Sequence, residues 1–127
     1  MSEPGENLSR IVSAWLAMLQ TGNSVELASI LDPYVVWQGI LPEQICHNRD
    51  EVLGILVRNQ RPLRLTRINA EEIGDRVAVS VLGPDFVDVD EQPAEEPRSL
   101  VFTFRAGTVV RINSLPSREA AFELAAH

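Results

Sequence analysis

The sequence has almost no cysteine, no lysine and no long apolar run, and the first and last of these shortages each exclude a class of protein. The only cysteine among the 127 residues is Cys46. A single thiol excludes an internal disulfide and a thiolate-rich zinc site, and it fits a reducing compartment. No apolar run approaches the roughly 20 residues of a membrane span. The acidic first six residues do not resemble a secretory signal, so we expect a cytoplasmic protein with no membrane partner.

Lysine is absent, and all 11 basic residues are arginine, which hints at a bacterial source. The net charge is −7, but it is concentrated in residues 84–97, which carry six acidic residues and no basic one. The remaining 12 acidic and 11 basic residues almost cancel. A nearly neutral body argues against nucleic acid as the main partner.

The length and the 45% hydrophobic content suit one globular domain spanning residues 1–127. Its first third has helical periodicity. Over residues 8–20, the apolar side chains recur every three or four positions, as in an amphipathic helix that Gly22 would end. Asn23 is expected to cap a short second helix, which Asp32-Pro33 ends.

A β-branched and aromatic stretch from Tyr34 to Gly39 then predicts the first strand. Residues 40–47 have the composition of a connecting loop. Asn48 and Glu51 form a capping-box pattern at the start of a third helix, which Pro62 prevents from continuing.

Beyond this helix the hydrophobic period changes to two, which predicts strands. Turns are expected at Gly74-Asp75 and Ala106-Gly107. Val110 and Ile112 are expected on one face of the last strand, and Ser117 should cap a closing helix that docks on the body through Ala120, Ala121, Phe122, Leu124 and Ala125. The expected strands are residues 63–73, 76–83, 99–105 and 108–114.

Two short motifs carry a resemblance to a known family. Asp32…Val35-Val36-Trp37 has the form D-x-x-V-x-W, and Asn48-Arg49-Asp50-Glu51-Val52 follows after a loop. This pattern resembles the SnoaL-like branch of the nuclear transport factor 2-like superfamily, over about residues 6–116. Many members have glycine where this chain has Asn48, whereas Arg49 matches.

The resemblance implies an α+β fold shaped like a cone, with N-terminal helices packed on a strongly curved, mixed or antiparallel sheet. The open end of such a cone leads to a mostly apolar cavity. The superfamily includes isomerase-like, cyclase-like, hydrolase-like and dehydratase-like enzymes, as well as non-catalytic modules. Most members are homodimers through the outer face of the sheet, so a homodimer is expected.

The catalytic pattern of the isomerase-like members is not preserved. Aligned by eye, Trp37 stands where they have a catalytic aspartate, and an indole cannot abstract a proton. Tyr34 falls on the strand face opposite Trp37, so a tyrosine-based oxyanion hole is not supported. The remaining candidate for acid–base catalysis is His47, the only internal histidine, with a loop histidine of no catalytic role as the alternative.

Four aromatic residues, Trp15, Trp37, Phe102 and Phe104, either line the cavity as ligand contacts or fill the core. Arg111 and Asn113 share one face of the last strand. If that face looks inward, they are the expected polar ligand contacts. If it looks outward, they belong to a dimer surface.

No metal site and no cofactor are predicted. The aspartates of residues 84–97 lack the glycine and the spaced glutamate of an EF-hand loop, and two histidines give little support to zinc. The arginine run is either an anion site or surface charge; its members are Arg58, Arg61, Arg64 and Arg67.

The sequence therefore leaves three functions open. The first is a SnoaL-like protein that binds a small, mostly apolar molecule in the cone. The second is a lyase, isomerase or hydrolase acting on a polycyclic or terpenoid-like substrate, with His47 as acid and base. The third is a non-catalytic dimerisation or partner-binding module whose cone is filled by aromatic side chains.

Overall fold

A computed structural model describes residues 5–58, 64–83 and 98–126. The acidic stretch 84–97, with the aspartates considered above for calcium, lies outside these residues, and so does Arg61. None of the helices in the described ranges is both long and apolar enough to span a bilayer.

The elements follow the order that the sequence predicts, with one additional short strand. They are α1 (Glu6–Thr21), α2 (Val25–Ile30), β1 (Leu31–Gln38), β2 (Ile45–Cys46), α3 (Arg49–Arg58), β3 (Arg67–Ile73), β4 (Arg76–Leu82), β5 (Arg98–Arg105), β6 (Thr108–Leu115) and α4 (Arg118–Ala126).

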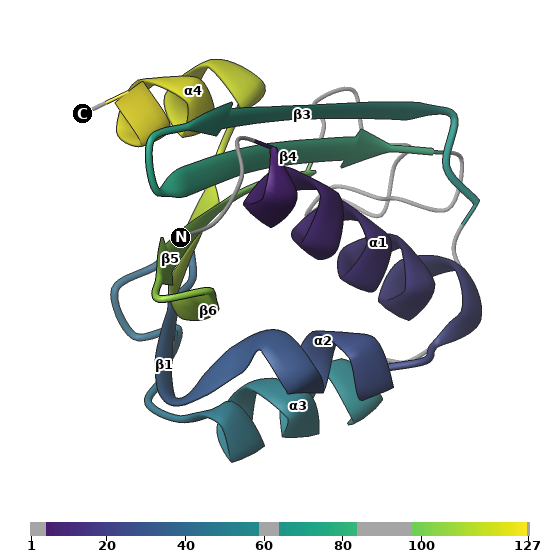
Figure 1. Ribbon diagram of the computed structural model, residues 1–127, viewed down its shortest axis with the longest axis vertical. Helices are drawn as coiled ribbons and strands as arrows, with labels where there is room; N and C mark the ends of the chain where they lie inside the picture. Colours follow the sequence, from purple (N-terminus) through teal and green to yellow (C-terminus); the bar gives the residue numbers. More distant parts are fainter. Residues whose placement is uncertain (1–4, 59–63, 84–97, 127) are drawn as a thin grey trace.

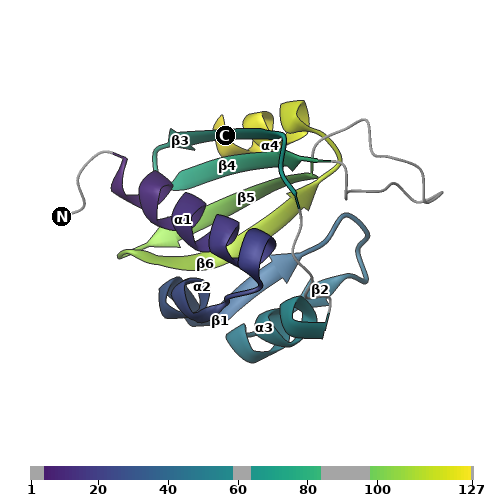
Figure 2. The same ribbon diagram turned by 90° about the vertical axis from the view of Figure 1, so that its right-hand side faces the viewer.

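The strands form one curved sheet in the order β2-β1-β6-β5-β4-β3. The β1–β6 pair is parallel, and the other neighbours are antiparallel. Figures 1 and 2 show α1 lying across one face of this sheet, with α2 and α3 beside β1. The α+β class, the mixed sheet and the cone-like arrangement are confirmed.

The prediction of a loop over residues 40–47 was wrong near its C-terminal end, where the structure has strand β2. Ile45 and Cys46 pair with Gln38 and Trp37, so the chain makes a hairpin that adds β2 to the edge of the sheet. Two residues are too few to show the period-two pattern from which strands are predicted. Cys46 is thereby brought beside Trp37, and both side chains line the open end of the cone.

Other differences concern boundaries. Strand β1 begins at Leu31, immediately after α2, and β3 begins at Arg67. In β6 the buried positions are Val109 and Ile112 rather than Val110 and Ile112. The cause is a register irregularity opposite Thr103 and Phe104, which inserts an extra residue and shifts the alternation.

The helix caps follow the sequence closely. Gly22 ends α1 with a positive φ of 73°, and its N–H donates to the carbonyl of Met18. The Asn48 side chain accepts from the N–H of Glu51, and Ser117 accepts from the N–H of Ala120 at α4. The second helix differs, because Ser24 is its N-cap and makes no side-chain cap bond, while the Asn23 side chain accepts from the N–H of Val25 at 3.0 Å.

Two long-range contacts fix α1 against the sheet. The Glu72 carboxylate of β3 accepts hydrogen bonds from the backbone N–H groups of Gly5, at 2.7 Å, and Leu8, at 3.3 Å. A carboxylate there satisfies free N–H groups and complements the positive end of the helix dipole. Arg10 donates to the carbonyl of Gly107 in the β5–β6 turn, at 2.7 Å.

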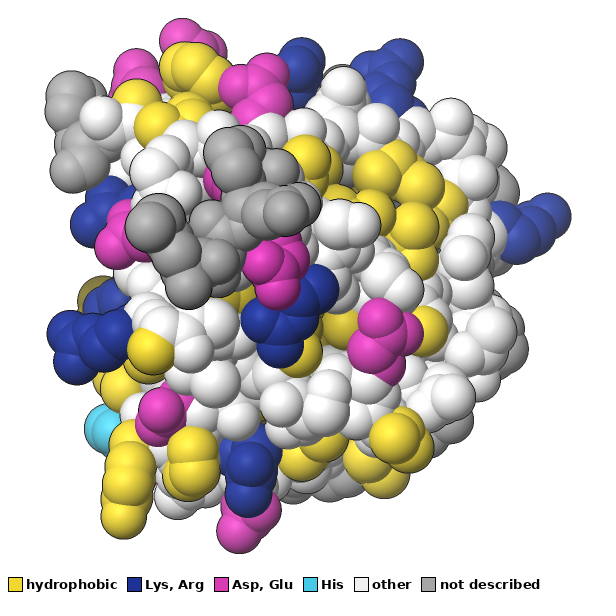
Figure 3. Space-filling view, viewed as in Figure 1, with side chains coloured by type: hydrophobic (Ala, Val, Ile, Leu, Met, Phe, Trp, Pro, Cys, Tyr) yellow, Lys and Arg dark blue, Asp and Glu magenta, His cyan; other side chains and the backbone are white. Residues whose placement is uncertain are grey.

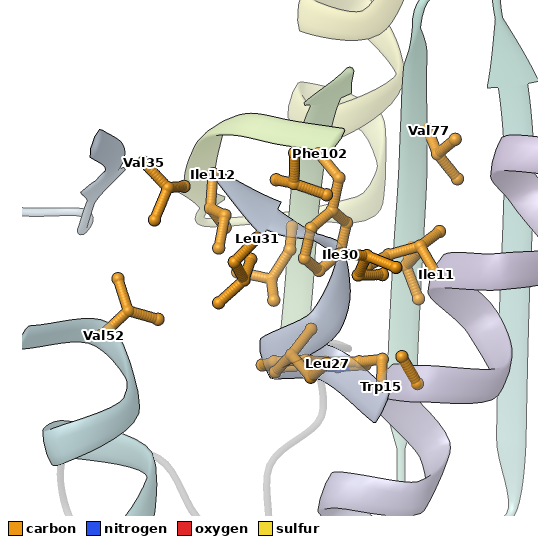
Figure 4. Close-up of a cluster of buried hydrophobic side chains, with 14 of the residues drawn as sticks. Ile11, Trp15, Leu27, Ile30, Leu31, Val35, Val52, Val77, Phe102 and Ile112 are labelled. Atoms are coloured by element: carbon orange, nitrogen blue, oxygen red, sulfur yellow. The ribbon is translucent and has the colours of Figure 1, made fainter. Parts of the chain in front are cut away.

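The main core lies between α1, α2, α3 and the inner face of the sheet. Figure 4 shows Phe102 of β5 near the middle of this cluster, with Ile11 of α1 and Leu31 at the start of β1 around it. All three side chains are at most 2% exposed. Every second residue of β4 and β5 lies in this core: Val77, Val79 and Val81, and Leu100, Phe102 and Phe104.

The C-terminal helix α4 lies on the opposite, outer face of the sheet, as Figure 1 shows over β3 and β4. Ala121 and Ala125 pack there with Ala78 and Val101 in a second, smaller cluster. Phe122, expected to dock, is instead 46% exposed. Helical geometry explains this, because the residue after Ala121 is turned by about 100° from the docked face.

Candidate functional site

The cone encloses a cavity of about 640 Å³ at its open end. Its walls come from α1, α3, the β1–β2 hairpin and the ends of β4, β5 and β6. Apolar and aromatic side chains dominate, as in most small-molecule sites. They include Trp15, Met18, Trp37, Ile40, Ile45 and Leu100.

Trp37 is the second-last residue of β1, and its side chain faces this cavity. It is paired with Ile112 of β6 on one side and with Cys46 of β2 on the other. Its indole Nε1 donates a hydrogen bond of 2.9 Å to Oγ of Ser114, which lines the same cavity. The ring therefore has a fixed orientation and forms a wall of the site.

The four aromatic residues considered from the sequence separate into two groups. Trp15 and Trp37 both line the cavity and meet edge to face, with ring centroids 6.4 Å apart. Phe102 lies behind Trp15 at 5.6 Å, and Phe104 is 3% exposed in the same core. Neither phenylalanine is among the residues lining the cavity.

The hairpin between β1 and β2, residues 39–45, forms the edge of the cavity opening and is called the lip here. The N–H of Gly39 donates to the carbonyl of Gln44 at 2.6 Å, and the Gln44 side chain accepts from the N–H of Leu41 at 3.1 Å. The Gln38 amide donates to the Leu41 carbonyl at 3.0 Å. The lip is thus braced by two glutamine side chains.

Two apolar side chains of this lip combine exposure with a place in the cavity wall. Ile40 is 59% exposed and Ile45 is 39% exposed, although both line the cavity. Isolated exposed apolar residues are common, but here they continue the apolar lining out to the solvent. An apolar molecule entering the cone would cover them.

Arg111 and Asn113 lie outside the cavity. They are paired with Thr103 and Val101 of β5, and Val101 packs under α4 on the outer face. The two side chains are joined by a hydrogen bond of 3.3 Å from Nε of Arg111 to Oδ1 of Asn113. Of the two alternatives open from sequence, the structure places them on the outward face.

His47 is exposed at the start of α3 and does not line the cavity. Its backbone N–H donates to the Glu51 carboxylate at 3.3 Å, which completes the cap of the helix. A general base must lie within hydrogen-bonding reach of the proton it removes. The position of His47 therefore gives no geometric support to a role inside the cone.

The charged groups of the cavity wall are Glu43 and Arg98, and both are exposed at its rim. Within the described ranges, no three histidine, cysteine, aspartate or glutamate side chains come close enough together to hold a metal ion. On the face of the molecule in Figure 3, basic side chains are interspersed with acidic and polar ones. Arg64 and Arg67, from the arginine run, are both exposed.

Sequence reasoning missed Ser114 and the lip. A signal for Ser114 existed, because it lies two residues after the buried Ile112 and so shares its face. The register shift at Val110 comes before Ile112 and leaves this spacing intact, so period two alone places Ser114 on the face of Ile112. The lip gave no periodic signal, because its shape comes from side-chain hydrogen bonds of Gln38 and Gln44.

No family model matches this sequence, and no curated protein matches it. Solved structures do match. A nuclear transport factor 2-like protein from Anabaena variabilis has a TM-score of 0.66 and 10% identity, over 91% of this chain and 92% of that one. A Catenulispora acidiphila protein with a ketosteroid isomerase-like fold, in complex with trimethylamine, has a TM-score of 0.65 and 17% identity, over 84% and 85%.

A third neighbour is a candidate polyketide cyclase from Pseudomonas putida. It has a TM-score of 0.62 and 15% identity, over 83% of this chain and 87% of that one. At these identities the likeness concerns the fold, which fits the curved sheet, the covering helices and the open cone described above. The chain has the nuclear transport factor 2-like fold, the fold of the superfamily whose SnoaL-like branch its motifs resemble.

Proposed function

We propose that this chain is a SnoaL-like protein that binds a small, mostly apolar molecule in its cone. The observation that carries the proposal is the cavity of about 640 Å³ at the open end of the sheet, walled by Trp15 and Trp37. A ligand of one to three rings would bury most of its surface there. The trimethylamine bound by the Catenulispora protein supports the capacity of this fold to hold small molecules.

Binding without catalysis is the version that the geometry favours. His47 is exposed outside the cavity, and the charged groups of the cavity wall, Glu43 and Arg98, lie at its rim. A lyase, isomerase or hydrolase would need an acid or base close to the reacting atoms. An interaction module whose cone is filled by aromatic side chains is disfavoured, because Phe102 and Phe104 lie in the core and leave the cavity open.

We further propose that the protein is a cytoplasmic homodimer. Helix α4 packs mainly on β4 and β5 and less on β3 and β6, so the outer surface of β1 and the neighbouring part of β6 is available to a second copy. Arg111 and Asn113 lie on that surface. Their polar character suits the rim of an interface better than its centre.

Native mass spectrometry of the purified protein, compared with its denatured mass, tests the proposal. We expect a dimer that carries the additional mass of a small molecule. A Leu19→Trp variant, which adds bulk inside the cavity wall, should lose that mass. A Val25→Trp variant adds a similar ring at a position that is 75% exposed and outside the cavity, and should retain it.

If all three proteins carry the same additional mass, the molecule binds elsewhere and the cavity assignment is wrong. If none carries any after gentle purification, and none takes up mass from an added two-ring ketone, the binding function is contradicted. A monomer under all conditions would contradict the dimer alone.

A further inference from the structure

The Trp37–Ser114 pair is a polar contact in a mostly apolar cavity wall, whose other polar residues include Gln44 and Ser99. The two residues come from β1 and β6, neighbouring parallel strands, and both face the open end of the cone. Their hydrogen bond runs from Nε1 of Trp37 to Oγ of Ser114 at 2.9 Å.

The indole N–H can only donate, so Ser114 must be the acceptor in this bond. The serine hydroxyl still has its own proton to donate. Among the residues that the structure describes, no group accepts that proton. Donation from Trp37 also polarises the hydroxyl, because hydrogen bonds in a chain strengthen one another, and this makes Ser114 a better donor.

The surroundings of Ser114 determine what can accept the proton. Leu100 is its cross-strand partner on β5, and Trp15 lies behind the Trp37 ring. Both present apolar surface, whereas the charged Glu43 and Arg98 lie at the exposed rim. A ligand oxygen that reaches Ser114 is therefore carried by an apolar framework.

We propose that Ser114, oriented by Trp37, is the hydrogen-bond donor that selects ligands carrying an acceptor oxygen, such as a ketone, on an apolar ring system. This inference rests on the proposed binding function and adds the class of ligand. A ligand without the oxygen leaves the hydroxyl unpaired in a partly dry site, which lowers its affinity. Trp37 is a positioning residue in this arrangement, and Ser114 is the residue that contacts the ligand.

The test compares 1-tetralone with tetralin, which has the same two-ring framework but no oxygen. Dissociation constants are measured by ligand-observed NMR. One neutral hydrogen bond in such a site corresponds to a preference for 1-tetralone of about five- to tenfold. Both compounds fit within about 640 Å³, so size does not distinguish them.

Two variants of nearly identical shape isolate the hydroxyl. Ser114→Thr retains it and should keep the preference, whereas Ser114→Val lacks it and should bind the two compounds within about twofold of each other. Both are β-branched residues suited to a strand. Trp37→Phe retains a ring in the wall but removes the indole donor, and should reduce the preference to an intermediate value.

The outcomes separate the two proposals. Equal binding of both compounds by the wild-type protein, or a preference that survives in Ser114→Val, would overturn the role of Ser114 and leave the binding function standing. Binding of neither compound would overturn both. Trimethylamine, which when protonated donates but does not accept, provides a further check: if it binds in preference to 1-tetralone, the assigned acceptor chemistry is wrong.

Discussion

Replacing Phe102 by alanine tests the division of the aromatic residues into a packed core and a cavity wall. Phe102 is 0% exposed and meets Trp15 edge to face at 5.6 Å. Removing a fully buried phenylalanine costs about 3–5 kcal/mol, including the cavity that remains. The lost aromatic pair accounts for about 0.5–1.5 kcal/mol of this.

Phe122 provides the matched control, because the same substitution removes the same atoms from a side chain that is 46% exposed. About half of the transfer free energy of a phenylalanine is at stake there, which is roughly 1 kcal/mol. The two variants should therefore differ by about 2–4 kcal/mol in the free energy of unfolding.

Urea unfolding followed by tryptophan fluorescence measures this difference. With a slope of about 1.5 kcal/mol per molar urea, the midpoint should fall by about 2–3 M for Phe102→Ala and by less than about 1 M for Phe122→Ala. If Phe102→Ala does not fold, Phe102→Leu should still cost up to about 1.5 kcal/mol. Equal losses at the two positions would refute the placement of Phe102 in the core.

Three further predictions concern other parts of the chain. Gly83→Ala should lower the free energy of unfolding by about 1–3 kcal/mol, measured by thermal unfolding, because the added Cβ would overlap the backbone carbonyl of Arg64. Gly54 has open space around it, so Gly54→Ala should be neutral or stabilising. Glu72→Ala should lower the free energy of unfolding in urea by about 1–2 kcal/mol, because the hydrogen bonds to the start of α1 are lost. The same substitution at the exposed neighbour Glu71 should cost less than about 0.5 kcal/mol, and equal effects would contradict the cap. Cys46, 5% exposed and in the cavity wall, should react slowly with iodoacetamide, and more slowly when 1-tetralone is bound; unchanged rates would place the ligand elsewhere.

The parts of the fold that sequence predicted well are those governed by local rules. The helical stripe from Leu8, the stop at Gly22 and the caps at Asn48 and Ser117 depend on residues close together in the chain. The alternation in β4 and β5 separated the two faces of each strand, although it did not say which face looks inward. The motif around Trp37 then indicated the superfamily fold.

The parts that sequence could not supply depend on register and on contacts between distant segments. The extra residue near Val110 puts Val109 rather than Val110 on the buried face of β6, and nothing local marks it. The cap on α1 comes from Glu72, which is 67 residues from Gly5. The place of Ser114 beside Trp37 follows from the parallel pairing of β6 with β1.

The candidate site shows the same limit. Trp15 and Trp37 were expected as possible ligand contacts, and both line the cavity. Phe102 and Phe104 have the same chemistry and also point inward, but they lie deeper in the cone, where helices α1 and α2 close over the sheet. Position along a strand, rather than residue type, distinguishes the wall from the core.

The central claim, that a small molecule binds in the cone, is tested most directly by the two tryptophan side chains themselves. They are the only tryptophans in the chain, and both line the cavity. In a ¹H–¹⁵N NMR spectrum each gives one indole N–H signal, and Trp37→Phe identifies which is which. We predict that both signals shift and saturate as 1-tetralone is added, while backbone signals of α4, on the far face of the sheet, do not. Unmoved indole signals, or shifts confined to α4, would contradict the account.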